Sequence, residues 1–393
     1  MRANPSTQDP LRRDRRGGRS ATPQDPILAE LFSVERLEQH ARTLAAAQKV
    51  SDNTHRGRPV HPRVAENGQI LLESYRLLAR AIKDERAITP AAEWLVDNYP
   101  IVDEQLREIR DDLPRNYYHE LPKLTEGHLA GYPRVLGLAW AYLAHTDSRV
   151  DPESLRRMVL AYQEVEPLTI GELWAIAISL RILLVENLRR LSEQIVLSRT
   201  ARQSADVIAD RLLGLGQGSP EASATSLRRI LPDKLPTAAS VQLFQRLRDQ
   251  DPAVTPALAL LEKRLIAEGT TAEETVRLEH QRQATMNVTV RNVITSMRLI
   301  SSLDWTQFVE GVGVVDEILR AGSSFARLDF DTRDSYRKAI EELARGSILK
   351  EADVAHKAVE MSNAPPGIGE GAQAAPRYRD PGYYLISDGR VTL

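Results

Sequence analysis

The sequence contains no cysteine, and only 8 of its 393 residues are histidine. The absence of cysteine excludes disulfide bonds and thiol chemistry, and it fits a reducing compartment. Structural zinc sites use cysteine and histidine ligands at short spacings, and no two histidines here stand four residues apart. We therefore expect no metal site in this chain.

Long apolar runs are also absent. A membrane-spanning helix needs roughly 20 predominantly apolar residues, and the nearest run, 173–185, is interrupted by Arg181. The first 20 residues carry six arginines, but no apolar segment follows them, which argues against a secretory or twin-arginine signal. We predict a disordered leader over residues 1–25 and no transmembrane span in this chain.

Neither positive nor negative charge predominates in the sequence. The formal net charge is -2, with 27% charged and 42% hydrophobic residues. This balance is typical of an ordinary globular protein and gives no overall field that would attract nucleic acid. We expect no nucleic-acid partner.

Motifs that carry chemistry are incomplete. The segment Gly311-Val312-Gly313 lacks the third glycine and the preceding strand of a phosphate-binding loop. Asp329-Phe330-Asp331 has the DxD form with which glycosyltransferases hold a metal and a nucleotide diphosphate. However, no strand precedes it and no Gln-x-x-Arg-Trp follows it, so we interpret it as the acidic start of a helix. We predict no catalytic residue and no cofactor site in this segment.

What the sequence does contain is helical periodicity, because apolar residues recur at steps of three and four over most of its length. We predict an all-α fold, an irregular array of antiparallel helical hairpins. It should contain two long helices, one from the capping box at Thr169–Glu172 to about Arg199 and one over about 271–301. A short β-strand at Tyr383–Ile386 is expected near the C-terminus.

The same pattern divides the chain. After the leader we expect a helical domain over 26–213, a Gly/Ser linker over 214–223 and a second helical region over 224–362. Residues 363–393 would form a further linker and the orphan strand. The first domain should have an aromatic core, because residues 88–199 hold nearly half of all aromatic residues. We expect Trp174 to belong to that core.

One short stretch in this region is a candidate site. Two adjacent aromatics stand beside arginine, asparagine, histidine and glutamate: Arg115, Asn116, Tyr117, Tyr118, His119 and Glu120. Such a set could line a sugar-binding cleft by ring stacking and hydrogen bonds to hydroxyl groups, or form a domain interface. The alternative is a loop whose tyrosines pack on the core with their hydroxyl groups at its rim.

Several long strings carry a resemblance. AAEWLVDNYPIVDEQLREIRDDLPRNYYHELPKL, LAGYPRVLGLAWAYLAHTDSRVD and EVEPLTIGELWAIAISLRILLVENLRRL resemble the N-terminal region of cyclic β-1,2-glucan synthases, which precedes the glycosyltransferase domain. The likeness resumes at LDFDTRDSYRKAIEELARGS and at GYYLISDGR. It covers roughly residues 88–390, with a weaker middle from about 202 to 285.

The resemblance implies a place in a large enzyme of the Gram-negative inner membrane. In that family the glycosyltransferase domain uses UDP-glucose and a divalent cation, and it would follow this chain as its partner. The resemblance therefore suggests a helical scaffold on the cytoplasmic side of the inner membrane, with no catalytic motif of its own. A stand-alone helical enzyme that acts on glycans, or a helical interaction module, remains the alternative.

Overall fold

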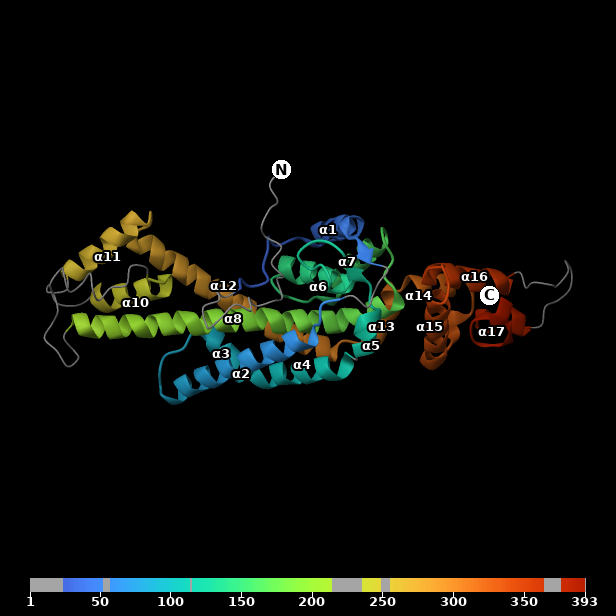
Figure 1. Ribbon diagram of the computed structural model, residues 1–393, viewed down its shortest axis with the longest axis horizontal. Coiled ribbons are helices and arrows are strands. Elements are labelled where there is room, and N and C mark those ends of the chain that lie inside the picture. Colours follow the sequence, from blue (N-terminus) through green and yellow to red (C-terminus); the bar gives the residue numbers. More distant parts are fainter. Residues whose placement is uncertain are drawn as a thin grey trace.

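Helices make up most of the structure, a computed structural model in which residues 24–51, 57–113, 115–213, 235–248, 255–363 and 376–392 are described (Figure 1). The expected linker at 214–223 and the candidate helix after it, up to residue 230, lie outside the described residues, as does most of the leader. One small sheet is described, in which β1 (Val50–Ser51) pairs antiparallel with β2 (Lys123–Leu124). The prediction of an all-α fold is confirmed.

The longest element is α8 (Ile170–Leu212), a helix of 43 residues and therefore about 65 Å long. It begins at the predicted capping box. The Thr169 hydroxyl accepts from the Glu172 backbone N–H at 3.1 Å, and the Glu172 carboxylate accepts from the Thr169 N–H at 2.9 Å. The helix that was expected to end near Arg199 continues to Leu212, because no proline or glycine interrupts it there.

Helices from the first half of the chain surround the N-terminal part of α8 (Figure 1). Helices α2 and α6 pack on it directly, and α1 packs on α7. In chain order these elements are α1 (Val34–Ala47), α2 (His61–Lys83), α3 (Pro90–Asp97), α4 (Tyr99–Asp112), α5 (Arg115–Glu120), α6 (Arg134–His145) and α7 (Pro152–Gln163). The break between α3 and α4 falls next to Pro100, as expected of a residue that cannot donate a helical hydrogen bond.

The first helix starts later than the pattern of apolar residues suggests. It begins at Val34 after the cap Ser33, not soon after Pro26. The residues before it bond to other elements instead. The Ile27 N–H donates to Asn187 Oδ1 at 2.7 Å, and the Ala29 N–H donates to the Ala144 carbonyl at 2.8 Å. These partners replace the bonds that another helical turn would make.

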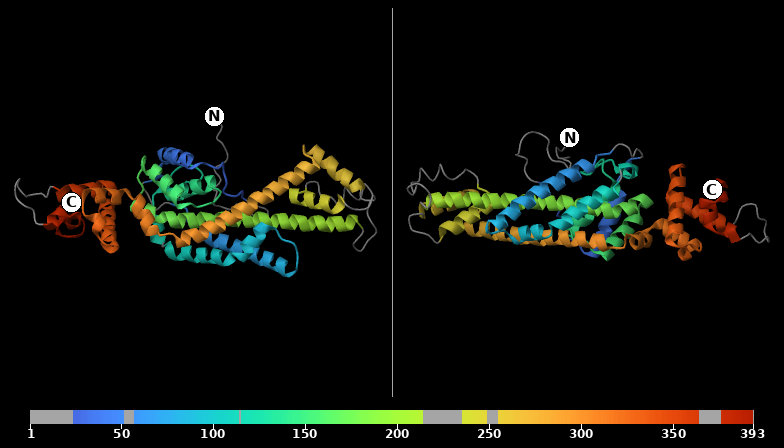
Figure 2. Two further views of the ribbon diagram at one scale, coloured as in Figure 1. Left: turned by 180° about the vertical axis from the view of Figure 1, so that it is seen from behind. Right: turned by 90° about the horizontal axis from the view of Figure 1, so that it is seen from below.

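The second long helix, α12 (Ala272–Ser302), returns along α8. The left view of Figure 2, seen from behind, shows it running along the main body. It contacts α3, α4 and α8, and its Val290, Val293 and Ile294 are fully buried in the main core. Helices α10 (Thr237–Arg248) and α11 (Thr255–Ala267) pack around the far end of α8. The main core thus takes side chains from both sides of the expected linker.

A separate group of helices, which we call the C-terminal cluster, lies at the end of the molecule where α8 begins (Figure 1). It follows α13 (Trp305–Val312) and shares its own apolar core. Its elements are α14 (Val314–Gly322), η2 (Phe325–Arg327), α15 (Phe330–Arg345), α16 (Glu351–Asn363), η3 (Pro376–Arg379), α17 (Pro381–Ile386) and η4 (Asp388–Thr392).

The expected strand at Tyr383–Ile386 is wrong, because these residues form part of helix α17. Asp380 caps that helix by accepting the Gly382 N–H at 2.7 Å, and Pro381 occupies its first turn. This start signal prevails over the apolar alternation. Tyr384 and Leu385 are 2% and 0% exposed, so this part of the tail packs within the cluster instead of waiting for a partner strand.

The expected aromatic core is present, with Tyr132, Tyr142 and Tyr162 fully buried. Trp174 differs, since it is only partly buried and packs against both the main core and the C-terminal cluster. Its place is therefore at the junction of two cores. Within the described residues, no helix is both long and apolar enough to cross a membrane.

Candidate functional site

The candidate stretch 115–120 is helix α5 and not the loop that was expected. Tyr117 is half-buried, Tyr118 is buried, and His119 and Glu120 are exposed. The side chains of Arg115 and Asn116 lie outside what the structure describes. The four described side chains therefore differ in their burial.

Both tyrosine hydroxyl groups are used inside the fold. Tyr117 donates to the Gly171 carbonyl at 2.5 Å, and Tyr118 donates to the Arg58 carbonyl at 2.7 Å. Burial, followed by the nearby carboxylates of Glu341 and Glu172, raises the pKa of Tyr117. The tyrosines thus tie α5 to the core.

The other two described residues differ in their surroundings. The His119 ring stands edge-on to that of Tyr118, with 6.2 Å between their centroids. Glu120 reaches the C-terminal cluster, where Arg345 Nη2 lies 3.0 Å from its Oε2. Arg345 is also paired with Glu341 at 3.2 Å.

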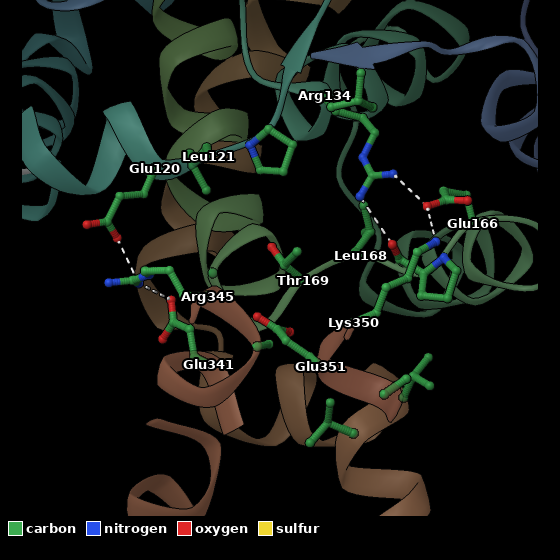
Figure 3. A pocket seen from close by; sticks show the side chains of 18 of the residues that line it. Glu120, Leu121, Arg134, Glu166, Leu168, Thr169, Glu341, Arg345, Lys350 and Glu351 are labelled. Atoms are coloured by element: carbon green, nitrogen blue, oxygen red, sulfur yellow. Dashed lines mark hydrogen bonds and ion pairs between the residues drawn. The ribbon is translucent and has the colours of Figure 1, made fainter. Parts of the chain in front are cut away.

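Glu120 and Tyr117 line a cleft of about 380 Å³ between the main body and the C-terminal cluster (Figure 3). The main body contributes α5, the segment before α8 and Arg134, and the cluster contributes α15, α16 and the turn between them. Its charged lining residues are Glu120, Arg134, Glu166, Glu341, Arg345, Lys350 and Glu351. We call this space the junction cleft.

On the main-body side, Arg134 is fixed by a buried ion pair. Its Nη2 and Nε donate to the two carboxylate oxygens of Glu172 at 2.5 and 2.9 Å. The Arg134 side chain is 5% exposed and that of Glu172 is fully buried. Arg134 also donates to the Pro167 carbonyl at 3.1 Å. This two-pronged geometry holds the segment before α8 against α6.

On the opposite side, Glu351 reaches into the first turn of α8. Its Oε2 accepts the Ile170 N–H at 2.7 Å, one of the N–H groups that a helix start leaves without an internal partner. Burial raises the pKa of Glu351 to about 7. The Ile170 N–H opposes this effect, and the carboxylates of Glu341 and Glu172 add to it.

The charged groups of the junction cleft mainly pair with one another across it. Lys350 Nζ lies 3.2 Å from Glu166, Arg345 pairs with Glu120, and Glu351 binds the α8 start. The arrangement can hold the C-terminal cluster against the main body.

Sequence reasoning found Glu120 and Tyr117 but missed Glu351, Arg134 and Arg345. The capping box did identify the start of α8, and with it the N–H groups that need partners. The sequence could not show which carboxylate accepts a hydrogen bond from these N–H groups, because residues 170 and 351 are brought together only by the packing of α16.

The remaining acidic candidate is a helix cap. Asp329 precedes α15 and accepts the Thr332 N–H at 2.9 Å, while its other oxygen accepts the Thr332 hydroxyl at 2.9 Å. Asp331 lies in the first turn of the same helix. Across the described part of the chain, no three histidine, aspartate or glutamate side chains are grouped so that they could hold a metal ion.

No protein-family model matches the chain. Among curated proteins, the cyclic β-(1,2)-glucan synthase NdvB of Rhizobium meliloti is 37% identical over 375 residues. The aligned region covers 94% of this chain but only 13% of that relative. Identity at this level over so long a stretch confirms the resemblance found from the sequence. The chain is therefore related, over nearly its whole length, to one segment of a much longer cyclic β-(1,2)-glucan synthase.

Proposed function

We propose that this chain is the N-terminal helical scaffold of a cyclic β-1,2-glucan synthase-like glycosyltransferase. In this role it packs on or positions a catalytic domain that uses UDP-glucose. The observation that carries the proposal is the match to NdvB, which takes in nearly all of this chain but a small part of the relative. Most of the relative, with room for its catalytic machinery, lies outside the matched segment.

The hydrogen bonds and ion pairs within the chain are consistent with a scaffold role. The tyrosines of α5 donate to backbone carbonyls, and the charged groups of the junction cleft pair across it. A glycan site would instead present such groups to a ligand. We assign UDP-glucose and its divalent cation to the catalytic domain, and we place this chain beside it on the cytoplasmic side of the bacterial inner membrane.

The C-terminal cluster offers the best contact surface for that domain. Ile348, in the turn between α15 and α16, is fully exposed, and Val391 of η4 is 95% exposed. Ile386, at the end of α17, is 49% exposed. Single exposed apolar residues are ordinary, but several on one small unit are typical of an interaction surface. We infer that this end of the molecule faces the catalytic domain.

A chimaeric synthase tests the scaffold role. Two variants of NdvB would be expressed in a strain that lacks its own cyclic β-1,2-glucan synthase. In one the segment that matches this chain is deleted, and in the other that segment is replaced by this chain. We expect the deletion to abolish cyclic β-1,2-glucan and the replacement to restore it. The replacement carrying Ile348→Asp should make less glucan, while Ile266→Asp on α11, also an exposed isoleucine, should not. If NdvB without this segment still makes normal amounts of cyclic β-1,2-glucan, the proposal is overturned.

The chain by itself should not incorporate glucose from UDP-glucose. Incorporation by the purified chain that disappears in Asp329→Ala and Asp331→Ala would favour the alternative of a stand-alone glycan-active enzyme. Incorporation that persists in both variants would equally contradict the scaffold role and would point to a site elsewhere in the chain.

A further inference from the structure

A second cavity lies on the other side of the main body, where the turn between α2 and α3 meets α8 and α10. Its volume is about 400 Å³, within the range of pockets that hold small ligands. Three arginines line it, namely Arg86, Arg199 and Arg202. We call it the arginine cavity, and it shares no lining residue with the junction cleft.

The most buried of the three is Arg199, which is 8% exposed. Among the described residues, its guanidinium makes one hydrogen bond, from Nη1 to the Ala87 carbonyl at 3.2 Å, and it has further N–H donors. Burial, followed by the neighbouring guanidinium groups of Arg86 and Arg202, lowers the pKa of Arg199. Both neighbouring guanidinium groups are thus close enough to repel that of Arg199.

The carboxylates near these arginines neutralise only part of their charge. Asp206 lines the cavity, but Gln242 donates to its Oδ1 at 2.8 Å and Arg246 Nε lies 3.8 Å from the same oxygen. Asp84 is on the surface and stands 3.9 Å from Arg86. Arg202 makes no hydrogen bond or ion pair within the part of the chain that the structure describes.

The start of α3 adds a second attraction for anions. Thr89 is its N-cap, yet the Thr89 side chain makes no capping hydrogen bond. Thr89 and Ala92 both line the cavity, so the positive end of this helix opens beside the arginines. Pro90 has no N–H group and the Ala92 N–H already donates to the Thr89 carbonyl at 2.8 Å, so the attraction comes from the helix dipole, which favours negative charge at this end.

We propose that the arginine cavity binds a small phosphate-bearing anion, held by the guanidinium groups of Arg199 and Arg202 beside the positive end of α3. Planar guanidinium groups match phosphate oxygens two at a time. A phosphate group carries up to two negative charges and so balances several arginines better than a single carboxylate does. The apolar side chains of Leu78, Ile88 and Ile195 line the same cavity and contact the rest of the ligand.

Titration calorimetry on the whole chain tests this with inorganic pyrophosphate as the probe, against sodium chloride at equal ionic strength. Wild-type protein should bind pyrophosphate, and added salt should weaken the binding. Arg199→Gln and Arg202→Gln should each raise Kd about tenfold, the usual effect of losing a charged hydrogen bond. Arg211→Gln removes an exposed arginine of the same helix that does not line the cavity and should leave Kd unchanged.

A second experiment, with lipid vesicles, distinguishes a soluble ligand from a lipid headgroup. Phosphatidylcholine vesicles with or without phosphatidic acid would be tested for binding by flotation. Binding only to the vesicles with phosphatidic acid, lost in Arg202→Gln, would identify the phosphate as a headgroup, and binding of pyrophosphate alone would identify a soluble ligand.

Arg202→Gln removes no hydrogen bond or ion pair within the described residues, so this variant should fold even if Arg199→Gln does not, and a circular-dichroism melt checks both. Failure of wild-type protein to bind either probe would overturn the proposal. So would binding that persists in Arg202→Gln.

Discussion

The carboxylate of Glu351 accepts a hydrogen bond from the backbone N–H of Ile170, with 2.7 Å between Oε2 and the nitrogen. Residue 351 begins α16, whereas residue 170 begins α8. This bond therefore joins the C-terminal cluster to the longest helix of the main body. It runs alongside two ion pairs, Glu120 with Arg345 and Glu166 with Lys350.

The first prediction concerns pH. Burial raises the pKa of Glu351 from 4.5 to about 7, so between these values the folded protein holds the proton more tightly than the unfolded chain. Stability should therefore fall as the pH rises from about 4.5 to about 7, by an amount on the order of 2 to 3 kcal/mol. Thermal melts of the wild type and of Glu351→Gln across this range measure the effect.

The Gln variant keeps an oxygen for the Ile170 N–H but cannot ionise. Its melting temperature should depend less on pH, and it should exceed that of the wild type at pH 8. Glu153→Gln serves as the control: it changes an exposed carboxylate on α7 that pairs with Arg156. That hydrogen bond lowers the pKa of Glu153, so this group stays ionised over the range and the variant should keep the wild-type profile. Identical pH profiles for Glu351→Gln and the wild type would contradict the assignment.

The second prediction concerns Trp174, whose ring contacts both the main core and the C-terminal cluster. Because it is partly buried, Trp174→Ala should lower the free energy of unfolding by about 2 to 4 kcal/mol, near the lower end for large core truncations. Hydrogen exchange should show faster exchange in α15 and α16 than in α6. Leu197→Ala, at a half-exposed position of the same helix, should change neither quantity. An unaltered melt for Trp174→Ala would refute its place at the junction.

The third prediction concerns the buried carboxylate of Glu186. Burial alone would raise its pKa, but the guanidinium groups of Arg189, Arg190 and Arg63 prevail and hold the pKa at about 2. This contribution to stability is present above pH 4.5 and is lost as the pH falls toward 2. Glu186→Gln should lower the free energy of unfolding by about 3 to 5 kcal/mol, because it leaves buried arginines without their partner.

Denaturant unfolding at pH 7 measures the effect of Glu186→Gln. Glu104→Gln, at an exposed position of α4, should have the stability of the wild type. If Glu186→Gln also unfolds at the wild-type denaturant concentration, the arginines around it must be stabilised by other means.

The fourth prediction concerns the tail. A Cβ atom added to Gly382 would clash with the hydroxyl of Tyr336, which donates to Asp380 Oδ1 at 2.7 Å. Gly382→Ala should therefore displace α17 and lower stability by about 1 to 3 kcal/mol. In the wild type, the amides of Tyr384 and Leu385 should be protected from hydrogen exchange, and in the variant they should exchange faster. Full exposure of these amides in the wild type would show that α17 is not packed as described.

Local sequence signals were enough to place most helices. The capping box at Thr169 and Glu172 marks the start of α8, and Asp151-Pro152 marks that of α7, because caps and prolines act on backbone groups within one turn. Pro100 likewise separates α3 from α4. At the tail the apolar alternation of four residues was misleading, because so short a run fits a buried helical turn as well as a strand.

The sequence by itself determined the helical class, the two long helices and the relationship to a segment of a glucan synthase. Only the tertiary structure decided that Glu351 meets Ile170, that Trp174 lies between two cores and that Arg86, Arg199 and Arg202 surround one cavity. The reason is physical. Helix starts and periodicity depend on neighbours within about four residues, whereas these groupings depend on which helix faces pack together. That choice is made by the whole core at once.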